Sequence, residues 1–119
     1  MAGGILSPEL VASVINAGMV GSIASGYLSL SVCEHFIQRV IALSSNRFIL
    51  NLFIEEPRQA SLRYQKPNKI IEIEQQLGIY EQDWFEVPPT IALHDYLSLV
   101  DKYQIPAIST TFGLLSQDM

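Results

Sequence analysis

The sequence predicts an α/β fold, in which a parallel β-sheet is built from strands that alternate with helices. Stretches with apolar residues at helical spacing alternate along the chain with short apolar runs of strand length. The clearest of these runs, residues 47–53, is apolar on both faces, as in a buried parallel strand. The 119 residues are 49% hydrophobic and 16% charged, which predicts one core-forming domain over residues 1–119.

Charge and cysteine content exclude several classes of protein. The net charge is −5, and the 7 basic residues are scattered instead of forming the positive face that a nucleic-acid-binding protein needs. The single cysteine, Cys33, excludes an intramolecular disulfide framework, and no Cys/His cluster predicts a metal site. We therefore expect a cytoplasmic protein with no nucleic-acid partner and no bound metal.

One uncharged stretch, residues 10–33, is long enough to span a bilayer. A secretory signal would need a positively charged start, but the first basic residue is Arg39. The stretch also contains Asn16, three glycines and several serines, a polarity that suits a buried helix, turn and strand better than a lipid-facing helix. The sequence therefore predicts no membrane partner.

The first helix and strand are predicted by their end signals. Ser7 suits an N-cap, Pro8 suits the first helical position, and Gly18 supplies the left-handed residue that ends a helix. Residues 19–24 follow as an apolar run of strand length.

The second helix and strand follow in the same way. Ser31 and Glu34 resemble a capping box, and the helix they open has an apolar stripe that includes Cys33. The strand over residues 47–53 contains Asn51, whose amide must find polar partners if it is buried.

The remaining elements complete the alternation. Residues 55–68 are polar and predict a long loop, and Asn68 is expected to cap a third helix that ends at Gly78. A connection containing Trp84 leads to a fourth helix, with Leu93, Leu97 and Val100 on one face, and to a last strand over residues 106–111. Three strands and four helices could form a small three-layer domain or part of a larger fold.

Four segments of the chain carry a resemblance to the nitronate monooxygenases, formerly called 2-nitropropane dioxygenases. Residues 1–10, 16–27, 51–53 and 105–113 resemble motifs of that family in the right order. The flavin-dependent enoyl-acyl-carrier-protein reductases share the glycine-rich segment and are the alternative. The Met-Ala-Gly-Gly and Asn-Leu-Phe motifs favour nitronate monooxygenase, although Met19 stands where that family usually has a second glycine.

The resemblance implies a (β/α)₈ TIM barrel that binds FMN at the carboxyl ends of its strands and oxidises alkyl nitronates with O₂. It implies that the backbone of Met1, Ala2 and Gly3 lies near the isoalloxazine ring, where glycine permits close approach. It further implies that Asn51 contacts the cofactor. By the same resemblance, the substrate rim includes two residues, Ser109 and Phe112.

The resemblance also implies that residues 1–119 form only a partial FMN-binding barrel domain. The first strand of the family would precede Met1, and the catalytic His and the phosphate-binding glycine loops would follow the last strand. We therefore expect no catalytic residue in this chain and no activity from it alone. The expected partners are a nitronate substrate and a complementary C-terminal chain or a second copy. The alternative is a non-enzymatic remnant or split-gene half.

Other chemically reactive side chains have simpler interpretations. His35 and His94 fall on predicted helices, away from the strand ends where barrel enzymes carry their catalytic groups. Cys33 lies on an apolar helical stripe and is expected in the core. Glu72 and Glu74 are expected on the solvent face of a helix, and no nucleophile–base pair is predicted.

Overall fold

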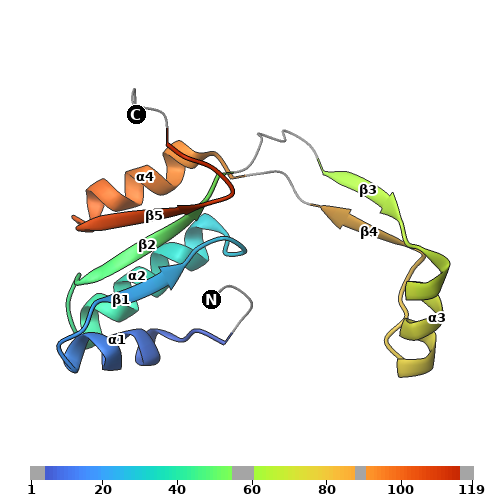
Figure 1. Ribbon diagram of the computed structural model, residues 1–119, viewed down its shortest axis with the longest axis horizontal. Helices are drawn as coiled ribbons and strands as arrows, with labels where there is room; N and C mark the ends of the chain where they lie inside the picture. Colours follow the sequence, from blue (N-terminus) through green and yellow to red (C-terminus); the bar gives the residue numbers. More distant parts are fainter. Residues whose placement is uncertain (1–4, 55–60, 88–90, 116–119) are drawn as a thin grey trace. The chain divides into compact units, whose positions relative to one another are not determined.

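The chain divides into two compact units in the computed structural model, which describes residues 5–54, 61–87 and 91–115. The first unit comprises Met1–Glu55 with Ile91–Met119, and the second comprises Glu56–Thr90 (Figure 1). Each unit has its own sheet.

The sheet of the first unit is parallel and has the strand order β1-β2-β5. Its strands are β1 (Gly21–Ala24), β2 (Phe48–Phe53) and β5 (Ala107–Thr111). Residues Ala24, Asn51 and Ser109 pair across the three strands and so share one face. The predicted α/β fold with parallel strands is therefore confirmed.

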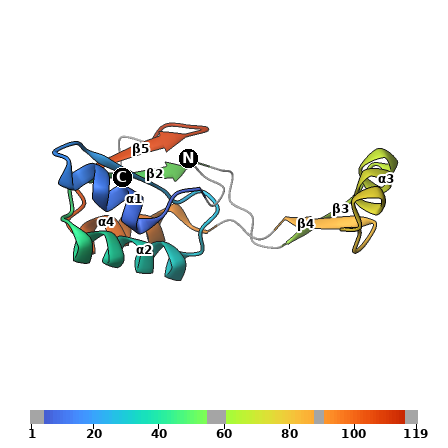
Figure 2. The same ribbon diagram turned by 90° about the horizontal axis from the view of Figure 1, so that it is seen from below.

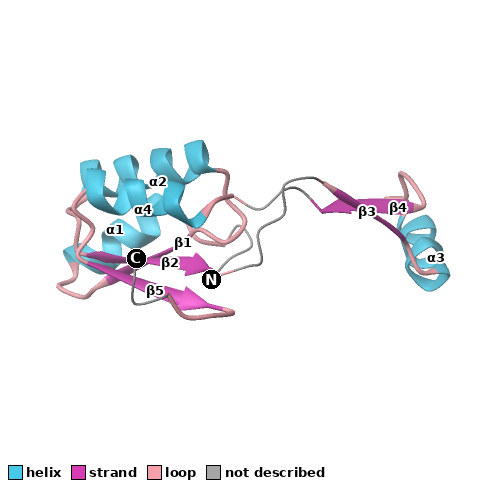
Figure 3. Ribbon diagram, turned by 90° about the horizontal axis from the view of Figure 1, so that it is seen from above, coloured by secondary structure: helices cyan, strands magenta, loops and turns pink. Residues whose placement is uncertain are grey.

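Three helices cover the same face of this sheet (Figures 2 and 3). They are α1 (Pro8–Asn16), α2 (Leu30–Leu43) and α4 (Leu93–Lys102). Their apolar sides and alternate strand residues form the core, whose fully buried members include Val11, Ile23, Cys33, Ile37, Val40, Phe48, Leu50 and Leu52. On the opposite face, the β2 residues Ile49, Asn51 and Phe53 are only partly buried, and no described helix covers them.

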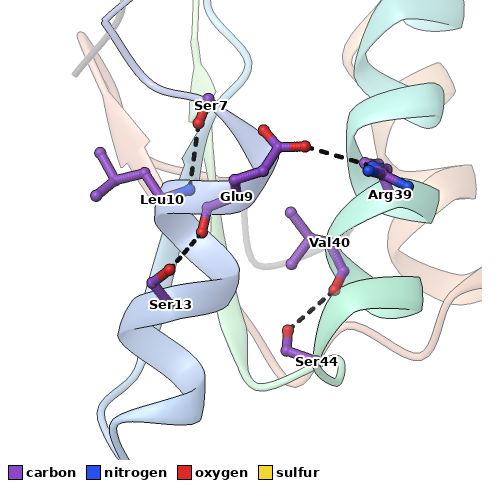
Figure 4. A network of polar contacts seen from close by, with 7 residues as sticks. All are labelled: Ser7, Glu9, Leu10, Ser13, Arg39, Val40 and Ser44. Atoms are coloured by element: carbon purple, nitrogen blue, oxygen red, sulfur yellow. Dashed lines mark hydrogen bonds and ion pairs between the residues drawn. The ribbon is translucent and has the colours of Figure 1, made fainter.

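Helix α1 begins and ends as predicted. The Ser7 hydroxyl accepts a hydrogen bond from the backbone N–H of Leu10 at 3.2 Å (Figure 4). Gly18 adopts φ 85° just after the helix. The neighbouring Glu9 Oε1 accepts a hydrogen bond from Arg39 Nε of α2 at 3.4 Å. Because both of these side chains are exposed, the pair between the two helices has little effect on stability.

Helix α2 begins two residues earlier than the sequence predicts, so the capping box at Ser31 is wrong. The N-cap is Ser29, whose hydroxyl accepts a hydrogen bond from the N–H of Val32 at 3.3 Å. Ser31 lies in the first turn, with its Oγ 3.2 Å from that of Ser29. The earlier start adds Leu30 to the helix and packs it against the core, which local capping signals could not reveal.

Two polar side chains at the end of α4 bind one carboxylate on α2. Lys102 Nζ and Tyr103 OH donate hydrogen bonds to Glu34 Oε1, at 2.7 and 2.8 Å. The Lys102 bond, followed by the Tyr103 bond, holds the pKa of Glu34 below its ordinary value. The same bond raises the pKa of Lys102.

Of the α4 residues, Leu99 is the most deeply buried, whereas the predicted stripe of Leu93, Leu97 and Val100 packs at the margin of the core.

The second unit corrects two predictions. The predicted loop over residues 55–68 contains strand β3 (Leu62–Gln65), and the predicted connection contains strand β4 (Trp84–Val87). These strands pair antiparallel with each other, with the rings of Tyr64 and Phe85 stacked 5.3 Å apart. The sequence of β3, Leu-Arg-Tyr-Gln, alternates apolar and polar residues over only four positions, and all four are exposed, so this short signal was missed within a polar segment.

Helix α3 (Asn68–Leu77) joins these two strands and ends at Gly78 with φ 69°, as predicted. Asn68 is its first residue and not its cap, because the N-cap position is Pro67, which makes no side-chain hydrogen bond. None of the residues of α3 is buried. Among the described residues, no helix is both long and apolar enough to cross a membrane.

Candidate functional site

The carboxyl ends of β1, β2 and β5 meet at one edge of the first unit, because the three strands are parallel. Asn51 of β2 lies on the uncovered face close to this edge. Its Nδ2 donates hydrogen bonds to Ser109 Oγ at 2.9 Å and to Thr111 Oγ1 at 3.2 Å, both on β5. The polar partners that the sequence required for this amide are therefore present, and they hold the amide in one orientation.

The backbone of Asn51 is bound from the other side by Ser25, which follows β1. The N–H and the hydroxyl of Ser25 both donate hydrogen bonds to the Asn51 carbonyl oxygen, at 3.1 and 2.7 Å. Ser25 is 1% exposed, and among the described residues it is the one polar side chain that is fully buried. Asn51 thus connects all three strand ends through hydrogen bonds.

Three aromatic rings lie at the same edge. The ring of Phe53, the last residue of β2, makes edge-to-face contacts with Tyr27 at 5.5 Å and with Phe112 at 5.0 Å. We call Tyr27, Phe53 and Phe112 the aromatic cluster. A Cβ at Gly26 would lie 2.2 Å from the Phe53 ring, so the ring's position requires glycine there.

The predicted site residues have different outcomes. Asn51 and Ser109 are brought into direct contact, and Phe112 lies at the same strand edge but contacts Phe53. The expected cofactor contacts of Met1, Ala2 and Gly3 lie outside the described residues.

Sequence reasoning missed two polar members of the site, Ser25 and Thr111. Thr111 could have been found from its position two residues after Ser109, because alternate strand residues share a face. Ser25 carried no comparable signal, since it follows the end of its strand.

The histidines and acidic residues for which the sequence predicts no catalytic role lie on helices and not at this strand edge. His35 lies on α2 and His94 on α4, where both are exposed, and His94 Nδ1 lies 3.1 Å from Asp95 Oδ1. Glu72 and Glu74 of α3 pair with lysines instead of with each other. In the part of the chain that the structure describes, no group of His, Cys, Asp or Glu is arranged to hold a metal ion.

Cys33 is in the core, as predicted, and its burial predicts a pH-dependent stability. Burial, with a smaller contribution from the Glu34 carboxylate, raises the pKa of the Cys33 thiol from 9.0 to about 11. The folded state thus favours the protonated thiol. This contribution to stability is complete below pH 9.0 and is lost as the pH rises through about 11.

Urea unfolding of the wild type and of Cys33→Ala between pH 8 and pH 11 measures this effect. The wild type should lose more stability than the variant over that range. Parallel pH profiles for the two proteins would contradict the prediction.

Comparison with known proteins identifies relatives over the full length of the chain. The sequence model of a family described as "Nitronate monooxygenase" matches residues 1–119. A probable nitronate monooxygenase of Bacillus subtilis is 31% identical over 125 residues, which cover 99% of this chain and 34% of the relative. A probable nitronate monooxygenase of Staphylococcus saprophyticus is 32% identical over 120 residues, covering 96% of this chain and 32% of the relative. The chain therefore spans about a third of the length of these curated relatives.

A solved structure, that of nitroalkane oxidase from Streptomyces ansochromogenes, is also similar. It matches with a TM-score of 0.71 and 24% identity, over 99% of this chain and 34% of that one. At this identity the likeness shows the fold alone. The parallel strands and helices of the chain form the N-terminal part of a (β/α)₈ TIM barrel, of which residues 1–119 supply only a portion.

Proposed function

This chain belongs to the nitronate monooxygenase family, and on that premise we propose that its strand ends form one wall of an FMN-dependent site that oxidises alkyl nitronates with O₂. The observation that carries the proposal is the Asn51 amide. It is bound to hydroxyls of β5 at the carboxyl edge of a parallel sheet, on the face that no described helix covers. In TIM barrels this edge is where active sites are built.

The residues at this edge fit a flavin ring. The Nδ2 donors of Asn51 are bound to the hydroxyls of Ser109 and Thr111, so this edge offers the Asn51 Oδ1 acceptor and the two hydroxyl groups to the alternating hydrogen-bond donors and acceptors along such a ring. Ala24 pairs with Asn51 across the sheet, and its small side chain leaves space beside the amide. FMN would supply the redox chemistry. The residues of this chain would orient the cofactor, because amides and aliphatic hydroxyls do not titrate near neutral pH.

The proposal includes a partner for the 119-residue chain. Because the chain spans about a third of its curated relatives, the catalytic His and the phosphate-binding loops would come from a complementary C-terminal segment. The uncovered sheet face and the edge strands β1 and β5 support such an association, since both present groups that a barrel normally pairs or buries. The same surfaces support the alternative of a non-enzymatic half that only associates. We propose the cytoplasm as the compartment.

A chimera with the Bacillus subtilis relative tests the function. We expect the purified 119-residue chain with added FMN not to oxidise propyl-2-nitronate. A chimera in which this chain replaces the matched third of the relative should bind flavin and consume O₂ with that substrate. Asn51→Ala in the chimera should weaken flavin binding by about tenfold, the equivalent of one to two lost hydrogen bonds. Flavin absorbance measures cofactor binding, and an oxygen electrode measures O₂ consumption.

A matched amide provides the control. Asn46→Ala removes a side chain of the same type from the opposite end of the strands, where Asn46 Nδ2 donates to the Gln104 carbonyl at 2.9 Å. It should leave flavin binding unchanged. A folded chimera that retains no flavin, or rapid turnover by the 119-residue chain alone, would refute the proposal. Oxidation of a nicotinamide cofactor with an enoyl thioester would favour the reductase alternative.

A further inference from the structure

We propose that the aromatic cluster of Tyr27, Phe53 and Phe112 binds the hydrocarbon part of the substrate and makes the site prefer nitronates with long alkyl chains. This inference rests on the proposed function and adds a specificity site to it.

The position of the cluster is that of a substrate site. Tyr27 follows β1, Phe53 ends β2, and Phe112 directly follows β5, so each ring comes from a different strand end. Their mutual edge-to-face contacts join them into one apolar surface. Tyr27 is 76% exposed and Phe112 is 74% exposed, so the rings present area to a ligand instead of filling the core.

The backbone around the cluster is built to hold the rings. Phe112 adopts φ 70°, a left-handed conformation that is unfavourable for residues other than glycine. The following turn is closed by a hydrogen bond from Thr110 Oγ1 to the Gly113 carbonyl oxygen at 2.8 Å. Gly26 leaves the space that the Phe53 ring occupies. An exposed aromatic residue kept in an unfavourable conformation is typical of a functional position.

The polar and apolar groups at this edge match the two ends of an alkyl nitronate. An alkyl nitronate has an anionic oxygen-bearing end and an apolar chain. Asn51 and Phe53 are alternate residues of β2 and share its uncovered face, so the polar hydrogen-bonding group lies beside the apolar rings. The aromatic cluster itself contains no charged side chain. The cluster therefore suits the hydrocarbon chain of the substrate, while Asn51 and its hydroxyl partners would bind the cofactor or the nitronate end.

Ligand-observed NMR on the 119-residue chain tests binding without flavin. With 1-nitrohexane as the probe, saturation should transfer from the protein to the hexyl protons, and nitroethane should show several-fold less transfer. Phe112→Gly should reduce the 1-nitrohexane signal severalfold. This variant removes the ring while placing at φ 70° the residue that best tolerates it, so the turn should persist. Phe85→Ala, which removes an exposed ring of the second unit, is the control and should change nothing.

The chimera tests specificity. In Phe112→Gly the ratio of kcat/KM for hexyl-1-nitronate to that for ethylnitronate should fall about tenfold, which is typical for losing a few apolar contacts. Equal losses for both substrates, or a saturation signal insensitive to Phe112→Gly, would overturn the inference. Loss of flavin from Phe112→Gly would also overturn it, because the rings would then hold the cofactor. An inactive, flavin-free chimera whose chain still binds 1-nitrohexane through the rings would refute only the proposed function.

Discussion

Replacing Phe48 with alanine is expected to lower the free energy of unfolding of the first unit by about 3–5 kcal/mol. Phe48 is fully buried at the start of β2 and is the largest side chain in the core between the sheet and its helices. The substitution removes the transfer free energy of the ring and leaves a cavity that the surrounding side chains fill only in part. A small domain is stabilised by only about 5–15 kcal/mol, so much of the total would be lost.

Urea unfolding followed by far-UV circular dichroism measures this loss, because helices α1, α2 and α4 all pack on the core that contains Phe48. Phe85→Ala is the matched control, since it removes the same ring from a half-exposed position in the second unit. We expect the control to leave the first unit's unfolding midpoint unchanged. A loss below about 1 kcal/mol for Phe48→Ala would contradict the tight packing of Phe48 in the core.

Replacing Glu74 with alanine is expected to destabilise the second unit by about 1–3 kcal/mol. Glu74 Oε2 of α3 lies 2.6 Å from Lys66 Nζ, which follows β3, and the two side chains are only 21% and 12% exposed. Removing the carboxylate leaves a largely buried ammonium without its partner. The unit has little other burial to compensate, since no residue of α3 is buried.

Trp84 reports on this unit selectively, because it is the single tryptophan of the chain and lies in β4. Its fluorescence should show a lower unfolding midpoint in Glu74→Ala, while the circular dichroism of the first unit changes little. Glu72→Ala is the control, because the Lys69–Glu72 pair at 3.0 Å is 76% and 56% exposed and should contribute less than about 0.5 kcal/mol. Equal effects of the two substitutions would show that burial of the Lys66–Glu74 pair has no importance.

Much of the first unit was predictable because its signals are local. Ser7, Pro8 and Gly18 bound α1 through capping and backbone conformation, which act within a few residues. The apolar run that became β2 was recognisable because a parallel strand covered by helices needs apolar residues. Asn51 was recognisable as a candidate site residue because it is the one polar residue within this apolar run.

Other features escaped prediction because distant contacts produce them. Strands β3 and β4 are separated by helix α3 and stabilise each other by pairing, although each is only four residues long. The choice between Ser29 and Ser31 as the cap of α2 depends on the packing of Leu30. Thr111 became a partner of Asn51 only when β5 paired with β2.

The amino-acid order alone was sufficient for the α/β class, the alternation in the first unit and the resemblance that led to the family. Each of these depends on residue spacing and on short motifs, which are properties of neighbouring residues. The second unit, the hydrogen-bonded group around Asn51 and the aromatic cluster required the folded chain. They join residues from about 20 to 60 positions apart in the sequence, and parallel strand pairing brings the members at the strand ends together at one edge.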